Sequence, residues 1–378
     1  MFSNSKADRV AVTYSGQACA DHQLAGTARA ASGRMAMVCR VLFCLLAALV
    51  GSCARPKLQT TELTVVSYGG GAYQESHRKA FVQPFQQITG VRVNSVVWNA
   101  DYGKLKAMVE SGRVPWDVVE VTEAQFARGT KENLFEKLIL LPDRDDFLSG
   151  TVSEFGVGNV YWGTVLAYTR DVFRNKQPQT WADFWDVDEF PGPRALYDDP
   201  RATLEFALLA DGVPLDKLYP IDIDRAFLKL DEIKPHVRVW WTDGSQPVQL
   251  LLTGSVVMSS AWNGRLYASD QARAGIGYSW QGAALELDYW VVPRGSANTD
   301  AASRFIFFAS QPYTLAAQTE LVGYGPVNKA ALQYVRENAR TQFPTYPSNW
   351  KVSFPVNAEW WSEHEERVKT KWLAWKMS

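Results

Sequence analysis

The sequence predicts an α/β protein with a largely parallel sheet. Apolar segments alternate with amphipathic ones between residues 63 and 121, in the order strand, helix, strand, helix, strand. Glycines follow several of these segments, and the composition, with 47% hydrophobic and 21% charged residues, is that of a globular protein. Such alternation is typical of α/β domains. With 378 residues, the chain has room for two to three domains.

Local patterns define the elements of the first domain. The apolar run Leu63–Tyr68 stops at three glycines and is expected to be a buried strand. Residues 72–89 carry apolar side chains near one face and are followed by Gly90, a common C-terminal stop of a helix. The same reasoning predicts strands over Val91–Trp98 and Trp116–Val121 and a helix over Asp101–Ser111.

Similar patterns continue through the rest of the chain. Residues 223–233, for example, have apolar side chains at helical spacing. The charged C-terminal segment EWWSEHEERVKTKWLAWK reads as a helix that either docks on the body, which we favour, or lies on a membrane surface. Further helices are predicted at 181–185, 204–210, 247–252, 303–310 and 312–321, and strands at 161–169, 194–197, 237–241, 256–260 and 287–292.

The N-terminal region reads as an export signal. Residues 41–50 are ten consecutive apolar residues, too few to span a bilayer, and Arg34 and Arg40 precede them. The run ends in Val-Gly-Ser-Cys at Cys53, which resembles a bacterial lipoprotein signal. We expect residues 1–53 to be a signal region and Cys53 to be lipidated. The mature protein would then lie in the periplasm and touch a membrane only through this anchor.

The first 34 residues do not fit a signal peptide, because they are polar, mixed in character and long. Met35 and Met37 each stand just upstream of the basic and apolar stretch. We expect one of them to be the true start, with residues 1–34 a mis-called extension.

Several chemistries find no support in the sequence. All four cysteines lie within the first 53 residues, so the rest of the chain has no disulfide, thiol nucleophile or cysteine-ligated zinc. The remaining histidines, His77, His236 and His364, form no HExxH or HxH pattern, and GxSxG is absent. A net charge of −1 gives no reason to expect nucleic acid as a partner. We expect no cofactor, no metal and no catalytic residue.

Several strings, taken in order, resemble the bacterial extracellular solute-binding proteins of ABC importers, of the spermidine/putrescine-binding type. These strings are VVSYGGGAYQESHRKAF, GRVPWDVVEVTEAQFARGTKENLFEKL, VYWGTVLAYTRDVF, TWADFWDVDEFPGPRAL, TLEFALLADGV, WWTDGSQPVQLLLTGSVVMSSAWNGR, LDYWVVPRGSAN and LVGYGPVNKAA. The resemblance covers about residues 62–335. A lipoprotein signal agrees with it independently, because such a receptor must be held where its importer is.

The resemblance implies a two-lobed periplasmic binding protein of the type II-like kind, with a ligand cleft between lobes joined by crossing strands. The lobes of such a protein close on the ligand about a hinge. On this basis residues 54–165 would form the N-terminal part of lobe 1 and residues 166–288 lobe 2. Residues 289–378 would complete lobe 1 and add the C-terminal helix. We expect a monomer with a membrane permease as its partner.

The resemblance also implies which residues contact the ligand. Tyr73 falls where a ligand-stacking tyrosine follows the first strand, Trp262 at a cleft tryptophan, and Tyr324 at a late aromatic contact. Asp288 falls at an amine-binding acid on the return crossing, and Asp199 near another. The full set predicted to bind the ligand is Gly70, Tyr73, Glu123, Asp199, Trp241, Trp262, Glu286, Asp288 and Tyr324.

An alkyl diammonium ligand needs carboxylates at its ends and aromatic faces along its chain. The sequence departs from the polyamine-binding pattern at three positions. Gly70 and Glu286 stand where those proteins carry tryptophans, and Ala202 stands where they carry a second acid. Glu123, expected in the loop after the third strand, could supply a carboxylate from the first lobe.

The leading hypothesis is therefore a solute-binding component of an ABC importer that binds a small cationic amine such as putrescine or spermidine. One alternative keeps the fold and changes the ligand to an amino acid or γ-amino acid, whose carboxylate could pair with Arg265 or Arg201. A second alternative keeps the fold and changes the ligand to ferric iron. Iron-binding proteins of this general fold use paired tyrosines as ligands, and no Tyr-Tyr dipeptide occurs in this sequence. A secreted hydrolase is a hypothesis of another class. It would use the close acidic pairs Asp198–Asp199 and Glu286–Asp288 as its catalytic carboxylates. A binding subunit that has no importer and signals through a sensor protein would show the same sequence features.

Overall fold

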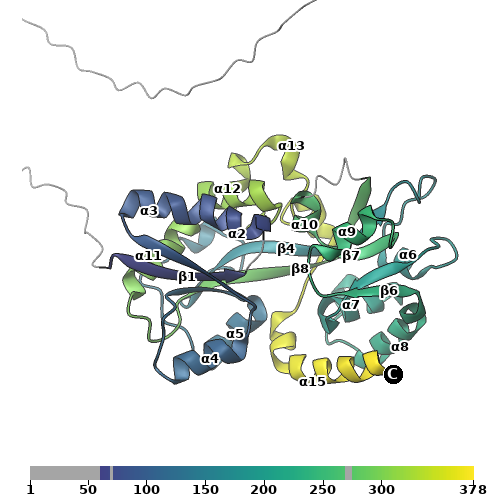
Figure 1. Ribbon diagram of the computed structural model, residues 1–378, viewed down its shortest axis with the longest axis horizontal. Coiled ribbons are helices and arrows are strands. Elements are labelled where there is room, and N and C mark those ends of the chain that lie inside the picture. Colours follow the sequence, from purple (N-terminus) through teal and green to yellow (C-terminus); the bar gives the residue numbers. More distant parts are fainter. Residues whose placement is uncertain (1–59, 69–70, 269–274) are drawn as a thin grey trace, which may run out of the picture. The chain divides into compact units, whose positions relative to one another are not determined.

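In the computed structural model, two long antiparallel strands run side by side through the middle of the fold (Figure 1). They are β4 (Gly156–Thr169) and β8 (Ile276–Val291). At one end β8 pairs with β3 (Val118–Thr122), and at the other end β4 pairs with β7 (Met258–Trp262). The two long strands therefore join two halves of the molecule, as the predicted crossing strands required.

The structure describes residues 60–68, 71–268 and 275–378. The predicted signal region 1–53, with the lipidation site Cys53, and the predicted ligand contact Gly70 lie outside these residues. Lys57–Ser378 cluster as one unit by their contacts. Within the described ranges, no helix is both long and apolar enough to cross a membrane.

The first half contains the predicted parallel sheet. β1 (Glu62–Tyr68) pairs in parallel with both β2 (Arg92–Trp98) and β3. Gly90, at φ 74°, caps the preceding helix in the left-handed conformation, which confirms the predicted stop. The surrounding helices are α2 (Gly71–His77), the π-helical turn η1 (Arg78–Val82), α3 (Gln83–Thr89), α4 (Tyr102–Glu110), α5 (Glu123–Lys131), α11 (Thr299–Ala309) and α12 (Pro312–Val322).

The second half has its own parallel strands. β5 (Arg194–Tyr197) lies between β6 (Val237–Trp241) and β7 and is parallel to both. The whole strand order is β2-β1-β3-β8-β4-β7-β5-β6, and the short strands β9 (Gly325–Pro326) and β10 (Phe354–Pro355) pair with β4 and β8. The helices of this half are α6 (Trp181–Trp185), α7 (Pro200–Ala210), α8 (Ile223–Ile233), α9 (Gln246–Leu252) and α10 (Asn263–Ala268).

Each half buries its own hydrophobic core. Phe81, Phe85 and Phe305 are fully or almost fully buried in the first, and Trp181 stacks on Phe206 at 3.6 Å in the second. Burying a large apolar side chain stabilises a fold by about 1.5–3 kcal/mol. The separate cores explain why the two halves read as separate α/β patterns in the sequence.

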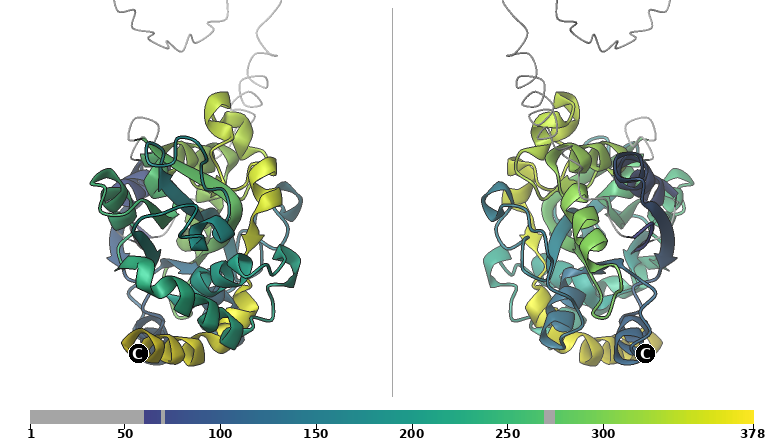
Figure 2. Two further views of the ribbon diagram at one scale, coloured as in Figure 1. Left: turned by 90° about the vertical axis from the view of Figure 1, so that its right-hand side faces the viewer. Right: turned by 90° about the vertical axis from the view of Figure 1, so that its left-hand side faces the viewer.

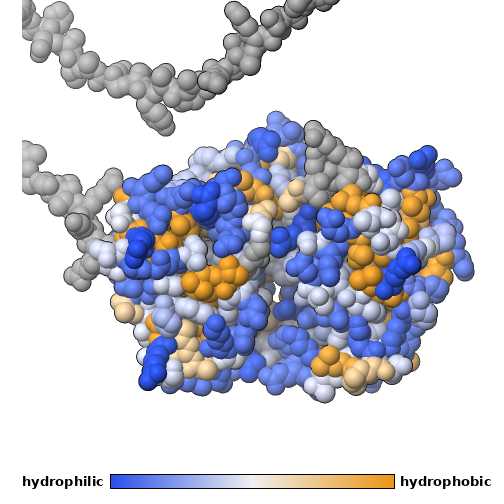
Figure 3. Space-filling view, viewed as in Figure 1, coloured by the Kyte–Doolittle hydropathy of each residue, from blue (hydrophilic) through white to orange (hydrophobic). Residues whose placement is uncertain are grey.

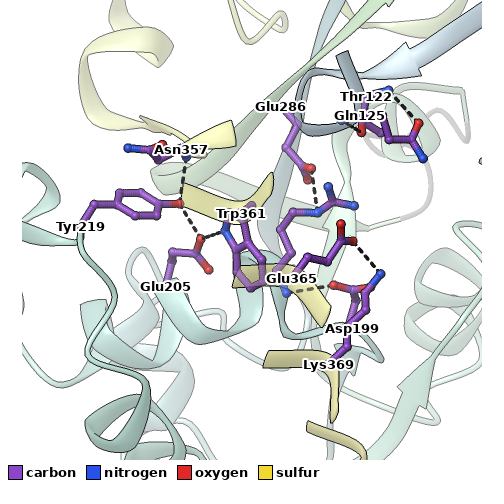
Figure 4. Close-up of polar contacts among 11 residues, drawn as sticks. Thr122, Gln125, Asp199, Glu205, Tyr219, Glu286, Asn357, Trp361, Glu365 and Lys369 are labelled. Carbon is purple, nitrogen blue, oxygen red and sulfur yellow. Dashed lines mark hydrogen bonds and ion pairs between the residues drawn. The ribbon is translucent and has the colours of Figure 1, made fainter. Parts of the chain in front are cut away.

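Several elements differ from the sequence prediction. β4 begins at Gly156 instead of residue 161, β7 covers Met258–Trp262 instead of 256–260, and α10 was not predicted. β8 begins at Ile276, whereas its predicted part began at Leu287, because Gly282 lies inside the strand at φ 71° and the register with β4 shifts. Glu123 was predicted in a loop but is the first residue of α5, because Thr122 and Gln125 form a capping box (Figure 4). The shorter segments α13 (Glu337–Arg340), α14 (Pro347–Val352) and the 3-10 turns at 144–146, 215–217, 234–236 and 331–334 were not predicted.

The C-terminal helix α15 (Ala358–Met377) docks on the body, as favoured from its sequence. Trp361, Trp372 and Trp375 are buried in the core of the second half. Figures 1 and 2 show the helix along one side of the molecule, next to α5 at its start and beside α7 and α8 further on. The three tryptophans are therefore packed against the body, whereas Leu373 and Met377 near the end of the helix are exposed.

Candidate functional site

A cavity of about 340 Å³ lies where strand ends from both halves meet. The face of the molecule in Figure 3 is mostly polar, with separate apolar areas, and is hollowed near its centre. Five cavity residues are the last residues of their strands, and carboxyl ends of strands are where α/β proteins place ligands. The lining residues are Tyr68, Tyr73, Trp98, Asn99, Ala100, Thr122, Trp162, Tyr197, Arg201, Thr242, Asp243, Gly244, Trp262, Arg265, Glu286, Asp288 and Tyr324.

The structure brings together five of the predicted ligand contacts and leaves three of the described ones outside the cavity wall. Those in the wall are Tyr73, Trp262, Glu286, Asp288 and Tyr324. Glu123, Asp199 and Trp241 do not line it. For all eight, contact with a ligand stays a prediction.

The three residues outside the wall have other surroundings. Glu123 lines a small adjoining space with Arg201 and Glu286, and burial raises its pKa to about 7. Asp199 caps α7 by accepting a 2.9 Å hydrogen bond from the Arg201 backbone N–H, and it lies 3.8 Å from Lys369 (Figure 4). Trp241 is fully buried behind the wall. It stacks on Tyr197 at 4.4 Å.

Aromatic rings form much of the wall. Trp262 meets Trp162 edge-on at 5.6 Å and Tyr197 at 5.7 Å, so three rings hold one another in place. On the other side of the cavity Tyr73 contacts Tyr324 at 5.6 Å. Trp162 and Tyr197, with Tyr68 and Trp98, were not predicted as site residues. The signal that could have found Tyr68, Trp98 and Tyr197 is an aromatic residue at the end of a strand.

One side of the cavity is acidic. Asp288 on β8 lies opposite Thr122 of β3, and it is only 4% exposed. Its Oδ1 has no hydrogen-bond partner in the described part of the chain. Burial, and then the neighbouring carboxylate of Glu120, raise the pKa of Asp288 well above its usual range. This buried, unpartnered carboxylate oxygen is suited to a cationic group of a ligand.

Glu120 lies behind Tyr73, and sequence analysis missed it because it sits inside the apolar string WDVVEV. It is fully buried and accepts hydrogen bonds from the hydroxyl of Tyr73 and, at 2.6 Å, from the side-chain amide of Asn159. Burial raises its pKa to about 7, although those two donors oppose the shift. The cavity therefore has a second carboxylate close to its acidic wall.

Two arginines also line the cavity. Arg201 Nε lies 3.2 Å from Glu286 Oε2. Burial disfavours the charged form of Arg201, but Glu286 and Asp199 outweigh burial and raise its pKa. Arg265 is different: its buried Nε has no hydrogen-bond partner in the described part of the chain. Asp243 lines the same cavity, and hydrogen bonds together with the charge of Arg265 lower its pKa. A guanidinium nitrogen without a partner is suited to the carboxylate of a ligand.

The described residues contain no group of three or more His, Cys, Asp or Glu side chains placed to hold a metal ion.

Comparison with known proteins identifies the family of the chain. Residues 80–346 match the family described as bacterial extracellular solute-binding protein. The chain belongs to this family. Its members are substrate-binding transport proteins, which confirms the prediction that this protein is not an enzyme.

Two curated relatives differ in their distance from this chain. A γ-aminobutyric acid-binding protein of Pseudomonas aeruginosa is 41% identical over 329 residues, which are 85% of this chain and 93% of the relative. A spermidine/putrescine-binding periplasmic protein of Escherichia coli is 23% identical over 293 residues, 74% of this chain and 82% of the relative. The predicted family is confirmed, but the polyamine-binding type is the more distant relation.

Solved structures confirm the predicted two-lobed binding-protein fold. An ABC transporter substrate-binding protein from Bradyrhizobium japonicum has a TM-score of 0.78 at 36% identity, over 84% of this chain and 99% of that one. A structure described as that of a GABA receptor has a TM-score of 0.77 at 34% identity, over 83% and 97%. This solute-binding protein is thus the binding component of an ABC importer. That role implies a membrane permease as its partner.

Proposed function

We propose that this solute-binding protein binds a small ω-amino acid of the γ-aminobutyrate class, rather than a polyamine. The observation that carries the proposal is that one cavity holds two buried charged-group atoms without a hydrogen-bond partner among the described residues, Oδ1 of Asp288 and Nε of Arg265. An ω-amino acid has one cationic and one anionic end, and the two groups complement them. The names of the relatives at 41% and 34% identity support the same class.

A diamine fits the cavity less well. It needs a carboxylate for each ammonium group, and a buried ammonium without one is costly. Glu286, the other predicted acid in the wall, already lies 3.2 Å from Arg201. A second ammonium near Arg265 would be repelled. This arrangement supports the alternative that the sequence left open over its main hypothesis.

We assign the groups of the ligand as follows. Its ammonium lies against Asp288, and its carboxylate lies against Arg265. The methylene chain between them lies along the rings of Trp162 and Trp262. A cation over an aromatic face contributes about 0.5–2 kcal/mol, so the rings support the ammonium as well as the chain.

The test is calorimetric titration of the full chain with γ-aminobutyrate, putrescine, spermidine, other amino acids and ferric iron. We expect γ-aminobutyrate to bind most tightly. Arg265→Gln should weaken it by about 30-fold or more, since breaking a buried charge pair costs about 2–5 kcal/mol. Arg238→Gln, which alters an exposed arginine outside the cavity, is the matched control. Tight binding of a diamine and none of γ-aminobutyrate would overturn the assignment.

Three further proposals come from the sequence. We propose lipidation of Cys53, a monomer, and lobes bounded at 54–165, 166–288 and 289–378 that close on the solute about a hinge. Mass spectrometry of the mature N-terminus tests the first. A Cys53→Ala variant that stays in the membrane fraction would contradict it.

A further inference from the structure

A second carboxylate lies directly behind the acidic wall of the cavity. Asp288 pairs with Thr122 across β3 and β8, and Glu120 pairs with Trp290 two residues along. Side chains two residues apart point to the same face of a sheet, so Glu120 and Asp288 are diagonal neighbours. Both are buried, with exposed fractions of 0% and 4%.

Neither carboxylate has a strong cationic partner among the described residues. Glu120 Oε2 and Asp288 Oδ1 have no hydrogen-bond partner there, and neither side chain forms an ion pair with a lysine or arginine. His77 Nε2 lies 4.0 Å from Glu120 Oε1, but burial lowers the pKa of this histidine to about 3, so it is neutral. Among the described residues, the pair therefore has no lysine or arginine in direct contact, although the charge of Arg201 acts on Asp288.

Two buried carboxylates at diagonal positions on one sheet face do not both ionise easily, and they titrate as a pair. Tyr73 and Asn159 donate hydrogen bonds to Glu120, which favours its charged form. Asp288 has the stronger rise in pKa, caused first by burial and then by Glu120 and Glu286. The proton of the pair is thus held mainly on Asp288, the acid that lines the cavity.

Other charged and titratable groups face the pair from the surrounding elements. The pKa values of the tyrosines are raised by burial, so these rings stay neutral. Glu286, whose pKa burial raises to about 7, titrates in the same range and needs its own test. The groups are Tyr68 from β1, Tyr73 and His77 from α2, Arg201 from α7, Arg265 from α10, Glu286 from β8, and Tyr324 before β9.

We propose that Glu120 and Asp288 share one proton in the ligand-free protein and that the ammonium group of the solute displaces it to the solvent. Glu120 is then a positioning residue: it acts on the solute through Asp288 and does not touch it. The inference rests on the proposed function only in requiring a cationic amine as the solute. It deepens that function by coupling solute capture to pH, with affinity rising as pH rises.

The first experiment is calorimetric titration of the full chain with γ-aminobutyrate, at several pH values from 5 to 8 and in two buffers of different ionisation enthalpy. We expect release of up to one proton, and a Kd that falls by up to about tenfold per pH unit below the pKa of the pair. Binding without proton release and with the same Kd at every pH would overturn the inference alone. Failure of every amine to bind would overturn the proposed function, and the inference with it.

Glu120→Gln gives a sharp second test. Both donors to Glu120 reach Oε1, so the glutamine carbonyl can still accept them while the charge is lost. We expect proton release to fall to less than half of the wild-type value and the dependence of Kd on pH to flatten. Full proton release in this variant would overturn the inference.

The chain offers a matched control in Glu205. It is fully buried, accepts from Tyr219 at 2.6 Å and from Trp361 at 2.8 Å, both through Oε1, and leaves Oε2 unpartnered among the described residues (Figure 4). It lies outside the cavity wall, so Glu205→Gln should leave proton release unchanged. Glu286→Gln tests the other acid of the cavity wall that titrates in this range. If Glu286→Gln alone abolishes release, the proton belongs to Glu286 and not to the pair.

Discussion

At the scale of single residues, Asp288 combines a proposed binding role with a cost in stability. Its pKa is raised by burial, so the folded chain binds a proton that the unfolded chain releases near pH 4. The contribution of this group to stability is therefore full below the unfolded pKa and is lost as pH rises toward the folded pKa.

Asp288→Asn should thus abolish measurable γ-aminobutyrate binding and stabilise the ligand-free protein. We expect a gain in unfolding free energy of about 1–3 kcal/mol at pH 8, comparable to the cost of a buried unsatisfied group, and little gain at pH 4. Denaturant titration at both pH values measures it. A variant that is less stable than the wild type at pH 8 would show that Asp288 is already well solvated or paired.

Gly244 tests the cavity wall by sterics. A Cβ atom at this position would lie 2.3 Å from Cε3 of Trp262 and 3.3 Å from Nε of Arg265. Gly244→Ala must therefore displace the tryptophan ring, and we expect γ-aminobutyrate affinity to fall at least tenfold. Gly103→Ala on α4 meets only the flexible Asp101 side chain and is the control. Equal affinity of Gly244→Ala and wild type would remove Trp262 from the ligand contacts.

The site was predictable only where local sequence carries the information. Trp262, Asp288 and Tyr324 stand in strings that resemble a known family, and all three line the cavity. Glu120 is hidden in an apolar strand, and its partner Tyr73 is 47 residues away. Contacts between distant segments depend on strand register, which a single sequence does not display.

At the scale of elements, the parallel strands and amphipathic helices of both halves were predicted, because their periodicity is local. β8 was predicted only in part, since the glycine at 282 and the register shift break its pattern. The short α13 and α14 escaped because single turns carry too few residues for a periodic signal.

The helix α15 separates burial from surface charge. Trp361 is fully buried and donates to Glu205, whereas Lys131 of α5 and Glu363 form an exposed ion pair at 3.2 Å. Trp361→Ala should cost about 3–5 kcal/mol, and Lys131→Ala less than about 1 kcal/mol. Denaturant unfolding compares the two variants. A larger loss for Lys131→Ala would mean that the contact between α5 and α15, and not core packing, holds the helix.

At the scale of the whole molecule, the cavity is enclosed by both halves. Tyr73, Asp288 and Tyr324 are less than 10% exposed, so a solute in contact with them is largely shielded from water. Asp288 lies on β8 beside β3 of the first half, whereas Arg265 follows β7 of the second. A solute that bridges these two residues therefore links the halves, and its binding energy adds to the stability of the closed state.

This arrangement predicts how γ-aminobutyrate changes the thermal stability of the whole chain. At about 100 times its Kd it should stabilise the protein by about 2.7 kcal/mol, raising the melting temperature by several degrees. Because the proton is displaced on binding, the shift at a fixed solute concentration should be larger at pH 8 than at pH 6. Calorimetric melting of the wild type and of Arg265→Gln measures both effects. If Arg265→Gln melts with the same shift as the wild type, the solute does not bridge the halves through this arginine, and its carboxylate is held elsewhere.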